Sequence, residues 1–347
     1  MKDVYAEVFQ FRGTHKAFGK FQGEKLLSSP LLANRKKQWG PRKERHFIID
    51  PEAFITQMKQ LAPQILDEID GLADVLELDH KEAIRLFSGY YLEYRRSGCS
   101  VYAAPKYMVR NYDSHPRSYE GHYMFYQPTD GGYAHVGPSM QVTGRVDGIN
   151  EKGLVMAYNF THRKQSDDGF LCNMIGRLIL ETCANVNEAI ELLKSIPHRH
   201  SFSYILLDPD GKSYVVEASP RTVEARLSSV CTNHFHLLNE ENRYRQDDSR
   251  RREKAIQMEQ QYSANPYQAF QVMNDPQYEI FSHKYDAAAG TLHTAVYFPE
   301  EKKAWLAIGP NRPPVLFDFH KWLQGEDTKI SRIRGKIDYP KGFANME

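Results

Sequence analysis

Residues 97–113, SGCSVYAAPKYMVRNYD, mark the point at which the character of the sequence changes. Within this stretch two short runs are rich in aromatic and small or β-branched residues. SVYAA at 100–104 and KYMVRNYD at 106–113 therefore indicate two strands. Further β-rich runs separated by turns follow as far as TLHTAVYF at 291–298. The pattern predicts a chain in which strands dominate after residue 98.

The connections between these runs favour antiparallel pairing in a mixed α/β chain. The stretch 203–219 predicts a hairpin, because the turn Asp208-Pro209-Asp210-Gly211 separates two apolar runs. Hairpins argue against an all-parallel, doubly wound sheet. The sequence also lacks the GxGxxG and GxxxxGK[ST] patterns, so the common phosphate-binding loops are missing.

Helices are predicted both before and between the strands. Asp50-Pro51 is a start signal, and apolar residues then recur at spacings of three and four through 55–69. Asp79 with Glu82 forms a capping-box pattern at the start of a second helix. Three further helices are expected at 171–184, 186–195 and 249–261.

The composition excludes several classes of protein. The 347 residues contain 45 Lys+Arg and 44 Asp+Glu, so the net charge of +1 argues against a basic nucleic-acid binder. No apolar run is long enough to cross a membrane, and the N-terminal MKDVYAEVFQFRG has no signal-peptide pattern, so a cytoplasmic location is expected. The four cysteines form no CxxC pair, which leaves a zinc ribbon or a redox dithiol without support.

Cys99 is the first candidate for chemistry. It stands where a charged segment gives way to a strand, and Arg95 and Arg96 just upstream would favour its thiolate. Small residues flank it, among them Gly98 and Ser100, and they would let a substrate or another backbone approach closely. The alternative is an inert cysteine buried at the start of a strand.

Two further groups of residues are candidates for the same site. Arg110 and Asp113 in MVRNYD would bring a guanidinium and a carboxylate near Cys99, unless they form a surface ion pair. Asn233 in CTNHF and Asn159 in MAYNF carry neutral amides, which make good oxyanion donors, although isolated asparagines more often occupy turns.

The histidine pairs suggest a metal site, but their surroundings do not support one. His198 with His200, and His234 with His236, are two residues apart, and a strand would put each pair on one face. No acidic or cysteine ligands accompany them at the usual zinc spacing, so neither a metal nor another cofactor is assigned. The charged run 243–255 predicts an exposed helix face. The basic stretch Arg35–Arg45 favours a processed lead-in or a solvated loop over a contact with nucleic acid.

Taken together, these segments resemble the acyl-coenzyme A:6-aminopenicillanate acyltransferase family of N-terminal-nucleophile hydrolases, which is related to the choloylglycine (bile-salt) hydrolases. The resemblance extends over roughly residues 10–310. It implies a four-layer αββα sandwich with two mostly antiparallel sheets, an α+β fold. The matching blocks are FRGTHKAFGKFQGEKL, SGC with RNYD, DGINEKGLVMAYNF, SIPHRHSFSYILLDPDGKSYVVEASP, VCTNHF and GTLHTAVYFPEEKKAWLAIG.

The resemblance also implies roles for individual residues. Cys99 is the nucleophile, and Arg110 and Asp113 position and activate it. Asn159 and Asn233 build or border the oxyanion hole. Bile-salt hydrolases have another catalytic arginine later in the chain. No residue is matched to it here, although His283 and Lys284 lie near the closing block.

In this family the nucleophile is the first residue of its chain, so that its α-amine serves as the base. Because Cys99 is internal, the resemblance implies self-cleavage between Gly98 and Cys99. The products would be a pro-segment or α-subunit, 1–98, and a catalytic β-subunit, 99–347, that together remain one structural domain.

The preferred function is an amidohydrolase that cleaves a linear C–N amide bond of a small N-acyl compound through a thioester acyl-enzyme. One alternative is an acyltransferase that moves an acyl group from a coenzyme A thioester to an amine. Another is a non-catalytic binding protein that never matures, and a third is an ordinary Cys-His protease. The expected partner is the small N-acyl substrate, without nucleic acid or membrane, and a homo-oligomer is left open.

Overall fold

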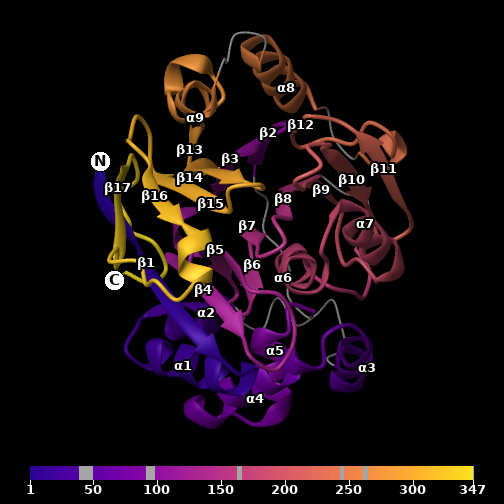
Figure 1. Ribbon diagram of the computed structural model, residues 1–347, viewed down its shortest axis with the longest axis vertical. Coiled ribbons are helices and arrows are strands. Elements are labelled where there is room, and N and C mark those ends of the chain that lie inside the picture. The colour runs from indigo at the N-terminus through magenta and orange to yellow at the C-terminus, as the bar shows by residue number, and fades with distance from the viewer. Residues whose placement is uncertain (39–49, 91–97, 162–165, 243–245, 261–264, 347) are drawn as a thin grey trace.

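The protein has two β-sheets packed face to face, with helices on their outer faces (Figure 1). This arrangement confirms the expected αββα sandwich. In the computed structural model the described residues are 1–38, 50–90, 98–161, 166–242, 246–260 and 265–346.

The larger sheet has ten strands among these residues. They are β1 (Lys2–Gly13), β4 (His122–Pro128), β5 (His135–Met140), β6 (Gly144–Arg145), β7 (Asp147–Asn150), β8 (Val155–Phe160), β9 (Phe202–Leu207), β10 (Tyr214–Ala218), β11 (Val223–Leu227) and β17 (Arg332–Ile337). Their order is β11-β10-β9-β8-β7-β5-β4-β1-β17, with β6 paired to β5. The neighbours β9 and β10 pair antiparallel, which confirms the hairpin predicted at 203–219.

The smaller sheet has seven strands in the described part of the chain. They are β2 (Gly98–Ala104), β3 (Tyr107–Ser114), β12 (Val230–Cys231), β13 (His283–Lys284), β14 (Ala289–Phe298), β15 (Lys303–Ile308) and β16 (Val315–Asp318). The stretch 97–113 supplies the β2–β3 hairpin, in which Cys99 is opposite Tyr112 and Gly98 is opposite Asp113. Contacts of β2 with β8, and of β14 with β7, join the two sheets near this hairpin.

The helices form the two outer layers and one end of the molecule. They are α1 (His15–Leu27), α2 (Leu31–Gln38), α3 (Pro51–Leu61), α4 (Gln64–Leu76), α5 (His80–Phe87), α6 (Cys172–Thr182), α7 (Val186–Ser195), α8 (Asp247–Gln260), α9 (Pro266–Asn274) and α10 (Phe319–Leu323). The pair α6 and α7 packs on the larger sheet, and α8 and α9 pack on the smaller one. In the described residues no helix has the length and apolar character of a membrane span.

The helix-start signals in the sequence are confirmed. The Asp50 side chain accepts a hydrogen bond from Glu52 N (3.1 Å) at the start of α3, and Asp79 accepts one from Glu82 N (2.8 Å) at the start of α5. The apolar run 55–69 is divided between α3 and α4, because the chain turns at Pro63 between them.

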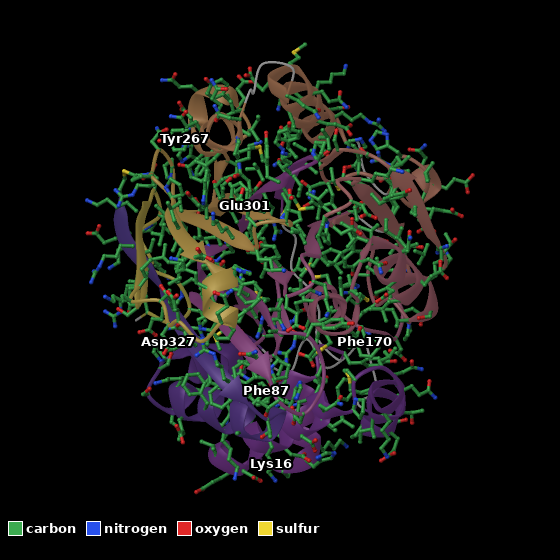
Figure 2. All side chains as sticks on the ribbon, viewed as in Figure 1. Lys16, Phe87, Phe170, Tyr267, Glu301 and Asp327 are labelled. Carbon is green, nitrogen blue, oxygen red and sulfur yellow. The ribbon has the colours of Figure 1, made fainter. Side chains whose placement is uncertain are left out.

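The segment before Cys99 is an integral part of the fold. Strand β1 lies between β4 and β17, and its pairing with β4 is parallel, whereas the other named strands pair antiparallel in the described chain. Helices α1 and α4 pack closely, since a Cβ on Gly19 would lie 2.0 Å from Glu68 O. Figure 2 shows Lys16 at this helical end, with Tyr267 of α9 at the opposite end. Strand β1 therefore shares one sheet with strands that follow Cys99 in the sequence.

Buried ion pairs join the same segment to α6. Arg177 of α6 donates to Glu68 of α4 (2.7 Å) and to Glu181 (2.5 Å). His15 of α1 lies with Nε2 2.8 Å from Glu181. Although burial opposes it, Arg177 and His15 hold the pKa of Glu181 at about 2. Removing one partner of such a buried pair typically costs about 3–5 kcal/mol.

Candidate active site

Cys99 is fully buried at the start of β2. Its backbone N–H donates to Asn233 Oδ1 (2.9 Å), and its thiol sulfur accepts from Arg110 Nη2 (3.3 Å). Burial raises the pKa of the Cys99 thiol, although the Arg110 charge opposes the shift. The thiol therefore needs a base to become a nucleophile at neutral pH.

Arg110 is held in place by three acceptors besides the thiol. It donates to the Asp147 carboxylate, to Val146 O (2.9 Å) and to Tyr158 O (2.9 Å). Burial alone would raise the pKa of Asp147, but Arg110 and His293 bring it down to about 2. Because Asp147 stays ionised, Arg110 keeps a fixed, charged guanidinium against Cys99 Sγ.

Asp113 also lies in the site, but its ion pair is with a different arginine. Its Oδ2 accepts from Arg252 Nη1 (2.9 Å), and its Oδ1 accepts from Thr291 Oγ1 (2.7 Å). Burial raises the pKa of Asp113, while Arg252 and Thr291 act against the rise. Arg110 and Asp113 therefore belong to two separate ion pairs, Arg110 with Asp147 and Asp113 with Arg252.

Gly98 occupies a position with little room for a side chain. A Cβ there would lie 3.0 Å from Asp113 Oδ2 and 3.4 Å from Arg252 Nη2. Both atoms belong to groups held by other hydrogen bonds, so they have limited freedom to move away. A glycine is therefore the residue that fits this position without displacing its neighbours.

Asn233 contacts Cys99 directly. Its Oδ1 accepts from Cys99 N and from Arg252 Nη2 (2.8 Å), and its Nδ2 donates to Phe160 O (2.8 Å). Asn159 lies beneath it and donates from Nδ2 to Cys231 O (2.9 Å) and Thr232 O (3.3 Å). The structure thus brings Asn233 to Cys99, whereas Asn159 fixes the segment that contains Asn233.

Arg252 is the site residue that the sequence did not reveal. Its side chain is 12% exposed and connects Asp113 with Asn233, although the run 243–255 had been predicted as an exposed helix face. Residues 243–245 lie outside the described chain. Within α8 the neighbouring Arg251 side chain is indeed 68% exposed.

A signal for the inner face of α8 is present in the sequence. Its buried residues Ser249, Glu253 and Ile256 recur at spacings of four and three, and Arg252 lies beside that face. His283 and Lys284 are exposed on β13, and Lys284 pairs with Asp248 (3.2 Å). Neither is among the described side chains that hydrogen-bond to Cys99, Asp113 or Asn233.

The side chains that hydrogen-bond to Cys99 in the described chain are those of Arg110 and Asn233, and neither is a histidine. His293 lies behind Arg110, where its Nε2 is 3.0 Å from Asp147 Oδ2. A Cys-His dyad therefore receives no support from this geometry.

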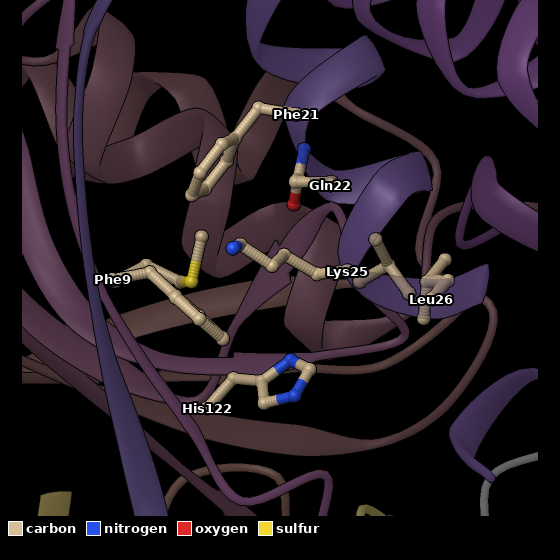
Figure 3. A pocket seen from close by; sticks show the side chains of 8 residues that line it. Phe9, Phe21, Gln22, Lys25, Leu26 and His122 are labelled. Carbon is tan, nitrogen blue, oxygen red and sulfur yellow. The ribbon is translucent and has the colours of Figure 1, made fainter. Parts of the chain in front are cut away.

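A small pocket lies elsewhere, between α1, β1 and β4 (Figure 3). The ammonium group of Lys25 lies 5.2 Å from the ring centroid of Phe21 and 5.6 Å from that of Phe9, and His122 lines the same space. Its volume of about 10 Å³ has room for no more than a water molecule. It shares no lining residue with the site around Cys99 and is not a substrate site.

Comparison with known families identifies the chain. Residues 102–313 match the family described as acyl-coenzyme A:6-aminopenicillanic acid acyl-transferase. The chain belongs to this family. The matched span of the acyl-transferase family contains Arg110, Asp113, Asn159, Asn233 and Arg252, and it begins shortly after Cys99.

Three solved structures are similar to this member of the acyl-transferase family at low identity. Penicillin V acylase from Agrobacterium tumefaciens is 15% identical, with 65% of this chain and 86% of that chain covered and a TM-score of 0.41. A mutant conjugated bile acid hydrolase from Clostridium perfringens is 15% identical, with 71% and 98% covered and a TM-score of 0.47. The Caenorhabditis elegans ortholog of N-acylethanolamine-hydrolyzing acid amidase is 12% identical, with 58% and 92% covered and a TM-score of 0.38. No curated protein matches the chain in sequence.

Proposed function

We propose that this protein is a self-processing N-terminal-cysteine amidohydrolase that cleaves a linear amide of a small N-acyl compound. The observation that carries the proposal is the environment of Cys99. Its thiol contacts Arg110, and its backbone nitrogen, which would become the α-amine, is bonded to Asn233. An α-amine titrates at about 7.7–8.0, which suits a base for the thiol near neutral pH.

Maturation follows from the position of Gly98. The Cys99 thiolate attacks the Gly98 carbonyl carbon, the Gly98–Cys99 C–N bond breaks, and residues 1–98 become a thioester on Cys99 Sγ. The former amide nitrogen takes up a proton and becomes the α-amine. Water then hydrolyses the thioester and leaves a Gly98 carboxylate and a free thiol. The confined space around Gly98 supports this step, since a Cβ there would crowd Asp113 Oδ2 at 3.0 Å.

Turnover would use the same thiol on a substrate carbonyl. The α-amine takes the thiol proton and passes it to the leaving amine, and the substrate acyl group stays on Cys99 Sγ until water releases it. Asn233 Nδ2 has one N–H toward Phe160 O and offers its second to the oxyanion. Asn159, through Cys231 and Thr232, holds that amide in place. Asp113, through Arg252, orients Asn233 and the α-amine.

Acyl transfer is the second candidate function, because the matching family is described as an acyl-transferase. A coenzyme A thioester would acylate Cys99, and an amine would take the acyl group in place of water. Both reactions pass through one acyl-enzyme. Adding amine acceptors to an acyl-enzyme assay therefore distinguishes them: a transferase gives the new amide, and a hydrolase gives the free acid.

The test of the proposed function is the intact mass of the purified protein, followed by a screen of N-acyl chromogenic amides. Two polypeptides, 1–98 and 99–347, are expected under denaturing conditions. They should co-elute under native conditions, because β1 lies inside the larger sheet. A chain that stays whole for days under native conditions and turns over none of the amides would contradict the proposal and favour a binding protein.

Replacing Asn233 separates its two contributions. Asn233→Ala should fold and lose turnover by roughly 10²–10³, the typical effect of removing one oxyanion donor. Asn233→Asp keeps an oxygen to accept from Cys99 N but loses the N–H donor, so it should process better than Asn233→Ala and still turn over slowly. The kcat of each mature variant is measured in a stopped assay, and circular dichroism is the control for folding. Near-normal turnover in both would remove Asn233 from the oxyanion hole.

A further inference from the structure

Three metal-ligating side chains converge beside the proposed catalytic site. His234 and His236 follow Asn233, and Glu253 follows Arg252 on α8. His234 Nε2 lies 3.2 Å from Glu253 Oε2, and His236 Nε2 lies 3.0 Å from Glu253 Oε1. One ligand atom from each of the three residues falls within 4.8 Å of the others. The sequence pattern suggested no acidic ligand for these histidines, but helix α8 supplies one from a distant part of the chain.

We propose that His234, His236 and Glu253 form a binding site for a zinc ion. Two imidazoles with one carboxylate are a recurrent zinc ligand set, in which a water molecule takes the fourth position. Bonds of about 2.0–2.1 Å in a tetrahedral site keep ligand atoms about 3.3 Å apart. The two nitrogen-to-oxygen distances above, each to a different oxygen of Glu253, are close to that spacing, and the three ligand atoms lie within 4.8 Å of one another, so the ligands would draw together around an ion.

The hydrogen bonds around His234 leave one ring nitrogen for an ion. Its Nε2 is buried and has no hydrogen-bond partner in the described chain, although Glu253 Oε2 is nearby. Its Nδ1 lies 2.8 Å from Ser249 Oγ, which also accepts from Asn233 N (2.7 Å) and donates to Thr232 Oγ1 (2.9 Å). With the proton on Nδ1, the ring donates to Ser249 Oγ or to Thr232 Oγ1, which lies 3.2 Å away, and the lone pair of Nε2 faces the other ligands. Such an outer hydrogen bond is the usual way in which a zinc-binding histidine is oriented.

Burial and charge also suit an ion at this place. The His234 side chain is fully buried, Glu253 is 9% exposed and His236 is 36% exposed, so an ion and its water would enter from the His236 side. The nearby Glu217 is already occupied, since it pairs with Arg226 (3.0 Å) and accepts from His236 N (2.8 Å). The ligand set is therefore the three side chains alone.

A zinc ion here would be structural. It would join the segment that contains Asn233 to the helix that contains Arg252, and those two residues meet beside Cys99. The site therefore goes beyond the proposed thiol chemistry and does not depend on it. Its test has a binding readout, so a failure of this proposal is distinguishable from a failure of the proposed function.

The experiment uses the full-length protein after chelator treatment and dialysis, titrated with Zn²⁺ alone in a calorimeter. One Zn²⁺ per chain and a higher Tm with Zn²⁺ are expected, and Co²⁺ should give the visible absorption bands of a tetrahedral site. His236→Ala, which alters the most exposed ligand, and Glu253→Gln should each weaken Zn²⁺ binding by about 100-fold or more.

Two control variants make the result decisive. His283→Ala removes an exposed histidine on β13 and should bind Zn²⁺ like the wild type. Cys99→Ala should also bind it normally, and if its binding is lost instead, the thiol is a ligand and the proposed site is wrong. A wild-type protein that binds no Zn²⁺, or that binds it as well as His236→Ala does, would show that the three residues form only an ion-pair cluster.

Discussion

Cys99→Ala is expected to remain a single chain of 347 residues and to have no detectable amidase or acyl-transfer activity. In the proposed mechanism one atom, Cys99 Sγ, is both the nucleophile for the Gly98 carbonyl and the carrier of the acyl group. Its removal therefore blocks maturation and turnover together. Intact mass measures the first loss, and a chromogenic N-acyl amide measures the second. A Cys99→Ala chain that still divides at Gly98 would refute the self-processing mechanism.

Cys183→Ala is the matched control for this variant. Cys183 is another buried free thiol, next to the end of α6, and burial raises its pKa to about 12. Among the described residues no arginine donates a hydrogen bond to it as Arg110 does to Cys99, so its thiol should be inert. Cys183→Ala should process normally and keep wild-type turnover. Cys99→Ser should process slowly, because a hydroxyl retains the position of the nucleophile but loses its acidity.

Local signals in the sequence predicted most of the elements around the site. The start of α3 follows from Asp50 and Pro51, whose effects are confined to the first turn. The β2–β3 hairpin and the β9–β10 hairpin follow from strand residues on either side of a short turn. Such features depend on neighbours in the chain, so a single sequence contains them.

Features that depend on distant parts of the chain were not predictable in this way. Strand β1 has polar residues next to apolar ones, and its place in the sheet is set by β4 and β17, which lie more than a hundred residues away. Arg252 stands in a run of three arginines, and only the packing of α8 determines which of them faces Asp113. Arg110 pairs with Asp147 rather than with Asp113, which is nearer in the sequence, because β7 of the opposite sheet brings the Asp147 carboxylate to Arg110.

Arg252→Gln should lower kcat/KM by roughly 10²–10³, an effect of the size seen when a preorganised electrostatic contact is lost. Arg252 bonds to Asp113 and Asn233, so the glutamine variant would leave a buried carboxylate without its cation. Arg252 opposes the upward shift that burial imposes on the pKa of Asp113. Without Arg252 the pKa of Asp113 rises further, so Asp113 becomes protonated at a higher pH than in the wild type. The acid limb of the pH profile of kcat/KM should therefore move to higher pH.

The adjacent Arg251 distinguishes this effect from a general loss of positive charge. Its side chain is exposed on the same helix and pairs with Asp248, so Arg251→Gln should leave both kcat/KM and the pH profile unchanged. Arg252→Lys retains the charge but not the planar fork that reaches two acceptors. Its acid limb should therefore lie close to that of the wild type, while its kcat/KM stays reduced. If Arg252→Gln and Arg251→Gln behave alike, Arg252 has no role in positioning Asp113 and Asn233. Equal pH profiles with a reduced rate in Arg252→Gln would limit its role to Asn233, because the ionisation of Asp113 would then not depend on it.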